Sequence, residues 1–239
     1  MSNNSRNSRS EAEKADYRIA IIGGTGKEGR GLAFRWALAG HNLIIGSRAI
    51  EKAQITADEI NALLPGGARR VSGLENIQAA DWAEIVVLTV PFSAHVSMLE
   101  YLKEAVKGKI VIDVSVPLVP PKVTIAQMPA AGSAGREAQK ILGEDTPVVM
   151  AFQNISYERL INEKDIDCDV LVCGTSKEAR DTVIRLVEEA GMTAWDAGPM
   201  ANAFVIEGLT SVLLHINKRY GSKETGIKIT GVTKEIRES

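Results

Sequence analysis

The sequence predicts an α/β protein of the doubly wound, Rossmann type, with a mainly parallel sheet and a smaller C-terminal α/β segment. Several short segments are apolar at every position, and they alternate with amphipathic segments of helical spacing. Strands that are apolar on both faces belong to parallel sheets covered by helices on both sides. A glycine-rich turn also joins the first of these strands to the first helix, which is typical of the same class.

The first half of the chain supplies the clearest elements. Apolar runs predict strands, and segments with helical spacing that end at glycine or proline predict helices. In chain order these are a strand at 17–22, a helix at 31–40, a strand at 41–48, a helix at 49–67, a strand at 83–91, a helix at 93–106 and a strand at 109–117.

The second half begins with a long loop, since residues 118–135 are rich in proline, alanine and glycine. The same patterns then predict a helix at 133–142, a strand at 147–152, a strand at 169–174, a helix at 176–191, a strand at 192–199 and a helix at 200–221. The last helix is apolar around most of its circumference, so we expect it to be buried, against a second copy of the chain.

Composition excludes several functions. Lys and Arg number 28 against 30 Asp and Glu, for a formal net charge of −2, which leaves no basic surface for nucleic acid. No apolar run of about 18 residues suggests a membrane span. Cys168 and Cys173 lack metal-site spacing, so no metal is expected and they are interpreted as reduced, buried thiols of a cytoplasmic protein. Residues 1–16 are polar and are predicted to be a disordered tail.

Gly24, Gly26 and Gly29 form the pattern G-x-G-x-x-G between the first strand and the first helix. In dinucleotide-binding folds the first glycine permits a tight turn, the second lets a diphosphate approach the backbone, and the third lets helix and strand pack closely. The free amides at the helix start attract the phosphates. The motif therefore predicts a dinucleotide, and the alternative is that the glycines only make a tight connection.

The end of the second strand indicates which dinucleotide binds. NAD-specific folds usually place Asp or Glu there, but this chain reads Gly46-Ser47-Arg48. A carboxylate would repel a 2′-phosphate, whereas the Ser47 hydroxyl and the Arg48 guanidinium would bind it. Lys52 lies on the same side if the helix begins near residue 49. We therefore predict NADP as the cofactor; the alternative is a solvated basic face at the helix start.

No catalytic side chain is predicted, because hydride transfer between two carriers needs alignment and exclusion of water more than a proton-transfer group. His41 is expected at a turn. His95 is expected either to contact substrate or to be exposed on a helix, and His215 is expected in the core. Pro91 ends a strand at the carboxyl edge of the sheet, where it would pack beside the nicotinamide ribose.

The sequence resembles the F420-dependent NADP oxidoreductases from Tyr17 to about Ile229. The resemblance begins with IAIIGGTGKEGRGLAFRWALAGHNLIIGSRAIEKA at residues 19–53. It continues through EIVVLTVPF, KIVIDVSVPLVP, SAGREAQKIL, VLVCG and DAGPMANAFVIEGLTSVLLHIN. It implies that NADPH and the deazaflavin F420 exchange a hydride, and that a homodimer forms through the C-terminal segment.

The resemblance also implies that the two parts of the chain have different roles. Residues 17–155 would form an NADP-binding Rossmann domain, and residues 156–239 an acceptor-binding and dimerisation segment. The implied cofactor contacts are Gly24, Thr25, Gly26, Lys27 and Glu28 for the diphosphate, Ser47, Arg48 and Lys52 for the 2′-phosphate, and Val90 and Pro91 beside the nicotinamide. The small-molecule acceptor is expected near Phe92, Gln153, Asn154 and Phe204.

The acceptor itself stays open at this point. Archaeal members of the family carry polar and cationic residues where this chain has Ala201, Ala203 and Phe204. An NADPH-dependent reductase of a flavin, an imine or a carbonyl compound is therefore an alternative. A non-catalytic NADP-binding sensor would share the same cofactor residues and is a second alternative.

Overall fold

The computed structural model describes residues 16–66, 71–162 and 166–233. Residues 1–15 of the expected tail lie outside this description. The described chain forms one sheet with the strand order β3-β2-β1-β4-β5-β6-β7-β8. Neighbouring strands are parallel throughout except β6 and β7, which are antiparallel. The strands are β1 Arg18–Ile22, β2 Asn42–Ser47, β3 Val71–Glu75, β4 Ile85–Leu88, β5 Ile110–Asp113, β6 Val148–Met150, β7 Asp169–Gly174 and β8 Thr193–Pro199.

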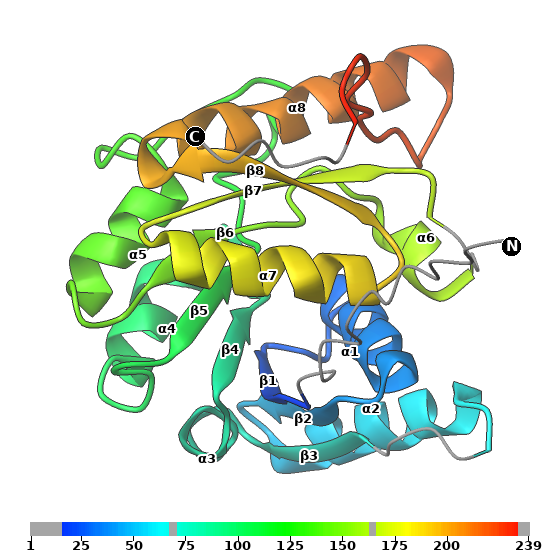
Figure 1. Ribbon diagram of the computed structural model, residues 1–239, viewed down its shortest axis with the longest axis vertical. Coiled ribbons are helices and arrows are strands. Elements are labelled where there is room, and N and C mark those ends of the chain that lie inside the picture. Colours follow the sequence, from blue (N-terminus) through cyan, green and yellow to red (C-terminus); the bar gives the residue numbers. More distant parts are fainter. Residues whose placement is uncertain (1–15, 67–70, 163–165, 234–239) are drawn as a thin grey trace, which may run out of the picture.

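Helices cover both faces of this sheet (Figure 1). They are α1 Lys27–Ala39, α2 Ile50–Leu63, α3 Asn76–Trp82, α4 His95–Leu102, α5 Ala134–Leu142, α6 Tyr157–Asn162, α7 Lys177–Glu189 and α8 Ala203–Tyr220, with short 3₁₀ turns η1 Phe92–Ala94 and η2 Met200–Asn202. The buried side chains of α1, α2 and α7 belong to one apolar cluster, and those of α3, α4, α5 and α8 belong to the other. The doubly wound class is therefore confirmed.

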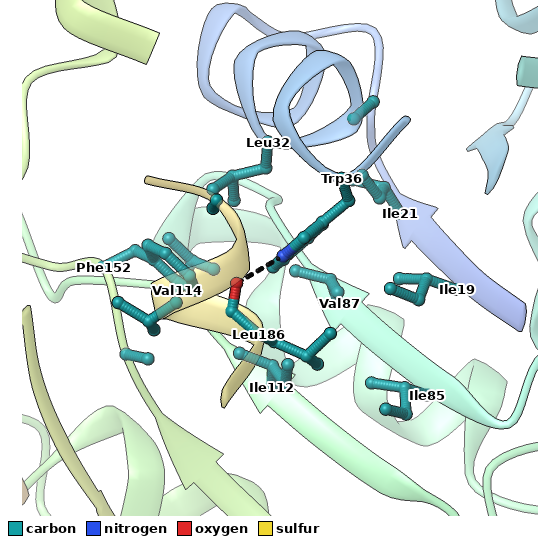
Figure 2. Close-up of a cluster of buried hydrophobic side chains, with 14 of the residues drawn as sticks. Ile19, Ile21, Leu32, Trp36, Ile85, Val87, Ile112, Val114, Phe152 and Leu186 are labelled. Atoms are coloured by element: carbon teal, nitrogen blue, oxygen red, sulfur yellow. Dashed lines mark hydrogen bonds between the residues drawn. The ribbon is translucent and has the colours of Figure 1, made fainter. Parts of the chain in front are cut away.

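The two clusters follow from the alternation of side chains along the strands. In β1, Ile19 and Ile21 point into the first cluster, while the intervening residues point into the second. Figure 2 shows the first cluster around Trp36 of α1, whose ring lies edge-on to Phe152 with centroids 5.7 Å apart. The Trp36 indole N–H donates to the Leu186 carbonyl of α7 at 2.8 Å, which ties together helices far apart in the sequence.

The structure differs from the sequence predictions in three short elements. Strand β3, helix α3 and helix α6 were not expected, and α1 begins at Lys27 rather than at residue 31. The sheet also continues across the expected boundary at residues 155 and 156, because β7 and β8 extend it. The division into two parts stays a prediction.

Helix α8 is less buried than its composition predicts. Phe204, Val205 and Val212 are each about half exposed, while Ile206 and Leu213 face the core. The helix therefore has one apolar face on the protein and another on its surface. Within the described residues, no helix is long and apolar enough to cross a membrane.

Candidate functional site

A cavity of about 1210 Å³ opens at the carboxyl ends of the parallel strands. Ligands of doubly wound sheets bind at this edge, where the strand order reverses on either side of β1. Of the residues expected at the site from the sequence, those lining the cavity are Thr25, Gly26, Glu28, Ser47, Arg48, Lys52, Val90, Pro91, Phe92 and Gln153. The fold thus brings together residues from both halves of the chain.

The glycine-rich turn has the geometry that its motif predicts. A Cβ atom on Gly24 would lie 2.7 Å from the Ile21 carbonyl oxygen, and one on Gly29 would lie 2.7 Å from the Gly24 Cα. A Cβ on Gly26 would meet nothing closer than 3.8 Å. The backbone at Gly26 is therefore open to a ligand. Gly23, which the motif does not include, also lines the cavity and has φ of 70°.

Helix α1 begins directly at this turn. Its N-cap is Gly26, and no side chain caps it, so the amides of the first helical turn are left for a ligand. Two buried or half-buried side chains fix the backbone of the turn by hydrogen bonds. Asn76 Oδ1 accepts from the Gly23 amide at 3.4 Å, and Thr89 Oγ1 donates to the Ile22 carbonyl at 3.0 Å. The arrangement suits a diphosphate group.

A basic cluster stands at the end of β2. Ser47 is buried and its Oγ accepts from the Ala49 amide at 3.3 Å, whereas Arg48 and Lys52 are exposed. Among the described residues, the side chains of Arg48 and Lys52 have no hydrogen-bond or ion-pair partner. Two unpaired cations at a helix start are unfavourable beside the positive end of the helix dipole, so a bound anion would stabilise them.

Two carboxylates also line this end of the cavity. Glu75 ends β3 and is the register partner of Ser47. Sequence reasoning missed it because it missed β3. Glu28, in the first turn of α1, has no hydrogen-bond or ion-pair partner among the described residues, and its burial raises its pKa to about 8. Glu28 is therefore mainly protonated, and uncharged, near neutral pH.

The opposite end of the cavity is less charged. Val90, Pro91 and Phe92 follow β4 there, and Ser115 follows β5. The C-terminal part of the chain contributes Tyr157, Thr210 and Leu214 to the wall. None of these last residues was singled out from the sequence, since nothing in their local pattern marks them as cavity residues.

The other residues expected at the site lie outside the cavity wall. Gly24 is buried in the turn, and its amide donates to the Ile21 and Gly46 carbonyls. The Lys27 ammonium lies over the Tyr157 ring and donates to its hydroxyl at 3.2 Å. Asn154 is buried and donates to the Ile206 carbonyl at 3.0 Å. Phe204 is half exposed on α8.

The structure corrects two expectations about histidines. His95 neither contacts the cavity nor lies exposed, because its side chain is completely buried between carboxylates. His215 is exposed on α8 rather than in the core. His41 lies just before β2, where its ring pairs with Glu189 at 2.7 Å. Cys168 and Cys173 are free and buried, as expected.

Comparison with known proteins identifies the family. The family model described as "NADP oxidoreductase coenzyme F420-dependent" matches residues 18–117. An F420-dependent NADP reductase of Methanocaldococcus jannaschii is 40% identical over 222 residues, which cover 90% of this chain and 99% of the relative. The chain belongs to the F420-dependent NADP oxidoreductase family. A second family member, from Methanothermobacter marburgensis, is 38% identical with the same coverage of both chains.

A solved structure supports the family assignment in three dimensions. A protein from Arthrobacter sp. FB24, provisionally named an F420-dependent NADP reductase, superimposes with a TM-score of 0.74 at 25% identity. The match covers 90% of this chain and all of the other. Within the described residues, no group of acidic, histidine and cysteine side chains could hold a metal ion.

Proposed function

We propose that this protein transfers a hydride between NADPH and coenzyme F420. The observation that carries the proposal is a single cavity that runs from the glycine turn and the unpaired cations Arg48 and Lys52 to the strand end at Val90 and Pro91. One end suits a phosphorylated adenosine, and the other suits a planar ring. The names of the two archaeal relatives support F420 as the second carrier.

The phosphate groups would be held at one end of the cavity. The uncapped amides of α1, with Thr25 and Gly26, would bind the diphosphate. Ser47, Arg48 and Lys52 would bind the 2′-phosphate by charge-assisted hydrogen bonds. Glu28, protonated near neutral pH, would not repel the diphosphate there.

At the other end, the chain would position two rings against each other. When bound, the nicotinamide supplies the hydride chemistry. Val90 and Pro91 would contact its ring and ribose, while Phe92 and Gln153 would face the acceptor. Thr210 and Leu214 enter the same wall from α8, which supports residues 156–239 as the acceptor-binding part. The hydride transfer itself needs no acid on the protein, so catalysis rests on alignment and exclusion of water. The proton that the reduced deazaflavin takes up at a ring nitrogen would come from solvent.

A spectroscopic assay tests this function. Mixing the pure protein with NADPH and F420 should bleach the deazaflavin absorbance at a rate proportional to enzyme concentration. A panel of flavin, imine and carbonyl acceptors tests the alternative acceptors that the sequence left open at Ala201, Ala203 and Phe204, none of which lines the cavity. Turnover with one of those compounds and none with F420 would reject F420 as the acceptor. Tight NADPH binding without turnover of any acceptor would instead indicate a sensor.

We propose in addition that two copies associate through α8 in the cytoplasm. The half-exposed Phe204, Val205 and Val212 form an apolar surface on this helix, and burying such a surface against a second copy would be favourable. Light scattering should therefore give the mass of a dimer, and Val205→Asp should give a monomer. A wild-type monomer at micromolar concentration would contradict the proposal. The buried thiols of Cys168 and Cys173 favour a reducing compartment.

A further inference from the structure

A buried cluster of ionisable side chains lies behind the wall of the cavity. His95 at the start of α4 and Asp113 at the end of β5 have no exposed surface. His95 Nε2 lies 2.7 Å from Asp113 Oδ2, and His95 Nδ1 lies 3.3 Å from Glu137 Oε2 on α5. Glu207 of α8 completes the cluster, and its carboxylate accepts the Ala134 and Gly135 amides at 2.8 and 3.1 Å.

The contacts of its two nitrogens determine the charge of the His95 ring. A neutral imidazole donates from one nitrogen only, whereas an imidazolium donates from both. Both nitrogens of His95 face carboxylate oxygens, which favours the imidazolium. Burial lowers the pKa of His95, but the hydrogen bonds and charges of Asp113 and Glu137 outweigh it and raise the pKa above its ordinary value. Glu207 also interacts with His95 through its charge, and burial raises the pKa of Glu207 to about 7.

Asp113 connects this cluster to the cavity in two ways. Its Oδ1 accepts from the Ser115 amide at 2.9 Å, and its backbone carbonyl accepts from Gln153 Nε2 at 2.7 Å. Ser115 and Gln153 both line the cavity. The Gln153 backbone is fixed as well, because its carbonyl accepts from Thr210 Oγ1 at 2.8 Å.

The contact with Asp113 determines how the Gln153 amide is oriented. Since a carbonyl oxygen can only accept, the Gln153 atom that faces it must be the NH₂ group. The other end, Oε1, is buried and has no hydrogen-bond partner among the described residues. A buried amide oxygen without a partner is costly. Because Oε1 is covered by the protein itself, a donor from a bound ligand would satisfy it only if the Gln153 side chain or the cavity wall moves slightly on binding.

We propose that His95 and Asp113 are positioning residues for the hydride-transfer site. The imidazolium holds the Asp113 carboxylate, which fixes the backbone at Ser115, and Asp113 in turn orients Gln153 so that Oε1 accepts an amide N–H from a bound ring. Phe92, stacked on His95 with centroids 5.5 Å apart, is held in the cavity wall by the same ring. This inference rests on the proposed function, in which both the nicotinamide carboxamide and the deazaflavin ring carry such N–H groups.

His95→Gln tests the inference, with His41→Gln as a matched control. His41 is buried like His95, and its ring lies 2.7 Å from the carboxylate of Glu189. It lies just before β2, at the amino end of that strand, whereas the cavity lies at the carboxyl ends of the strands. Both variants should lose thermal stability. Only His95→Gln should raise the KM for one of the two substrates, NADPH or F420. The rise should be on the order of tenfold, which corresponds to one hydrogen bond. A rise for F420 alone places the acceptor at Gln153, and a rise for NADPH alone places the nicotinamide there.

Two further measurements keep the inference falsifiable if His95→Gln folds poorly. Gln153→Leu should raise the same KM, because it removes the amide oxygen without disturbing the cluster's charges. ¹⁵N NMR of the histidine rings should find His95 as an imidazolium at neutral pH. In the wild type that KM should rise as pH increases through the raised pKa of His95, and Gln153→Leu should remove this rise. The separate ionisation of Glu28, whose pKa is about 8, would still weaken NADPH binding at higher pH in both proteins.

Three results would overturn the inference: a neutral His95 ring at neutral pH, His95→Gln kinetics equal to those of His41→Gln, or an unchanged KM for both rings in Gln153→Leu. Failure of the proposed function would look different. The wild-type protein would then not reduce F420 at all, while the NMR result and the dissociation constant of NADPH would still report on the cluster and on Gln153.

Discussion

Arg48→Ala should weaken NADPH binding and leave NADH binding nearly unchanged. Arg48 is exposed and has no partner among the described residues, so removing it leaves no other side chain unpaired. A hydrogen bond to a charged group contributes about 1.5–3 kcal/mol. Because the guanidinium is exposed, solvent and salt weaken its contribution. We expect a value near the lower end, which corresponds to roughly a 10- to 30-fold higher Kd for NADPH.

Fluorescence or calorimetric titration at low and high salt measures this effect, and the loss should shrink as salt increases. Arg219→Ala is a suitable control, because Arg219 lies in the last turn of α8, away from the cavity wall. It should bind both cofactors as the wild type does. An equal loss of NADPH and NADH affinity in Arg48→Ala would refute the assignment of Arg48 to the 2′-phosphate.

Three further predictions follow from the packing and the charges. Gly29→Ala would place its Cβ 2.7 Å from the Gly24 Cα. We therefore expect thermal unfolding to show a loss of stability of about 1–3 kcal/mol, and titration to show weaker NADP binding; unchanged binding would contradict the close packing. Trp36→Phe removes the bond to the Leu186 carbonyl and should cost about 1–3 kcal/mol in denaturant unfolding, whereas a neutral effect would make that bond dispensable. The pKa of Glu28 is about 8 in the folded protein, against an ordinary value of 4.5. Between these two pH values the folded protein holds a proton that the unfolded chain has lost, so the stability of the protein should fall as pH rises from 4.5 to 8. Glu28→Gln should flatten this fall in melting temperatures measured across that pH range, and an identical slope would contradict the burial of the carboxyl group.

The fold was predictable where burial leaves a strong sequence pattern. Strands β1, β4 and β5 are buried on both faces, so their segments are continuously apolar and easily recognised. Strand β3 is mostly half-buried or exposed, and helices α3 and α6 are only 7 and 6 residues long. Such elements have neither an apolar run nor enough turns to establish a period, so their positions come from tertiary contacts.

The site was predictable for the same local reason, and only in part. The glycine motif and Arg48 lie close together in sequence, and their chemistry is readable from their order. The pairing of His95 with Asp113, and of Asp113 with Gln153, joins residues from separate elements. No spacing rule connects them. Sequence reasoning therefore located the cofactor end of the cavity but not the buried cluster that supports the other end.

Transfer of an isotopic label tests the central claim most directly. NADPH deuterated at the transferable position of the nicotinamide is mixed with F420 and the enzyme in ordinary water, and the reduced deazaflavin is analysed by mass spectrometry. Because the cavity would hold both rings in contact and exclude water, the account predicts that the deuterium appears in the product. A reduced product that carries only hydrogen from the solvent would contradict direct transfer, and the absence of any reduced product would contradict the proposed reaction.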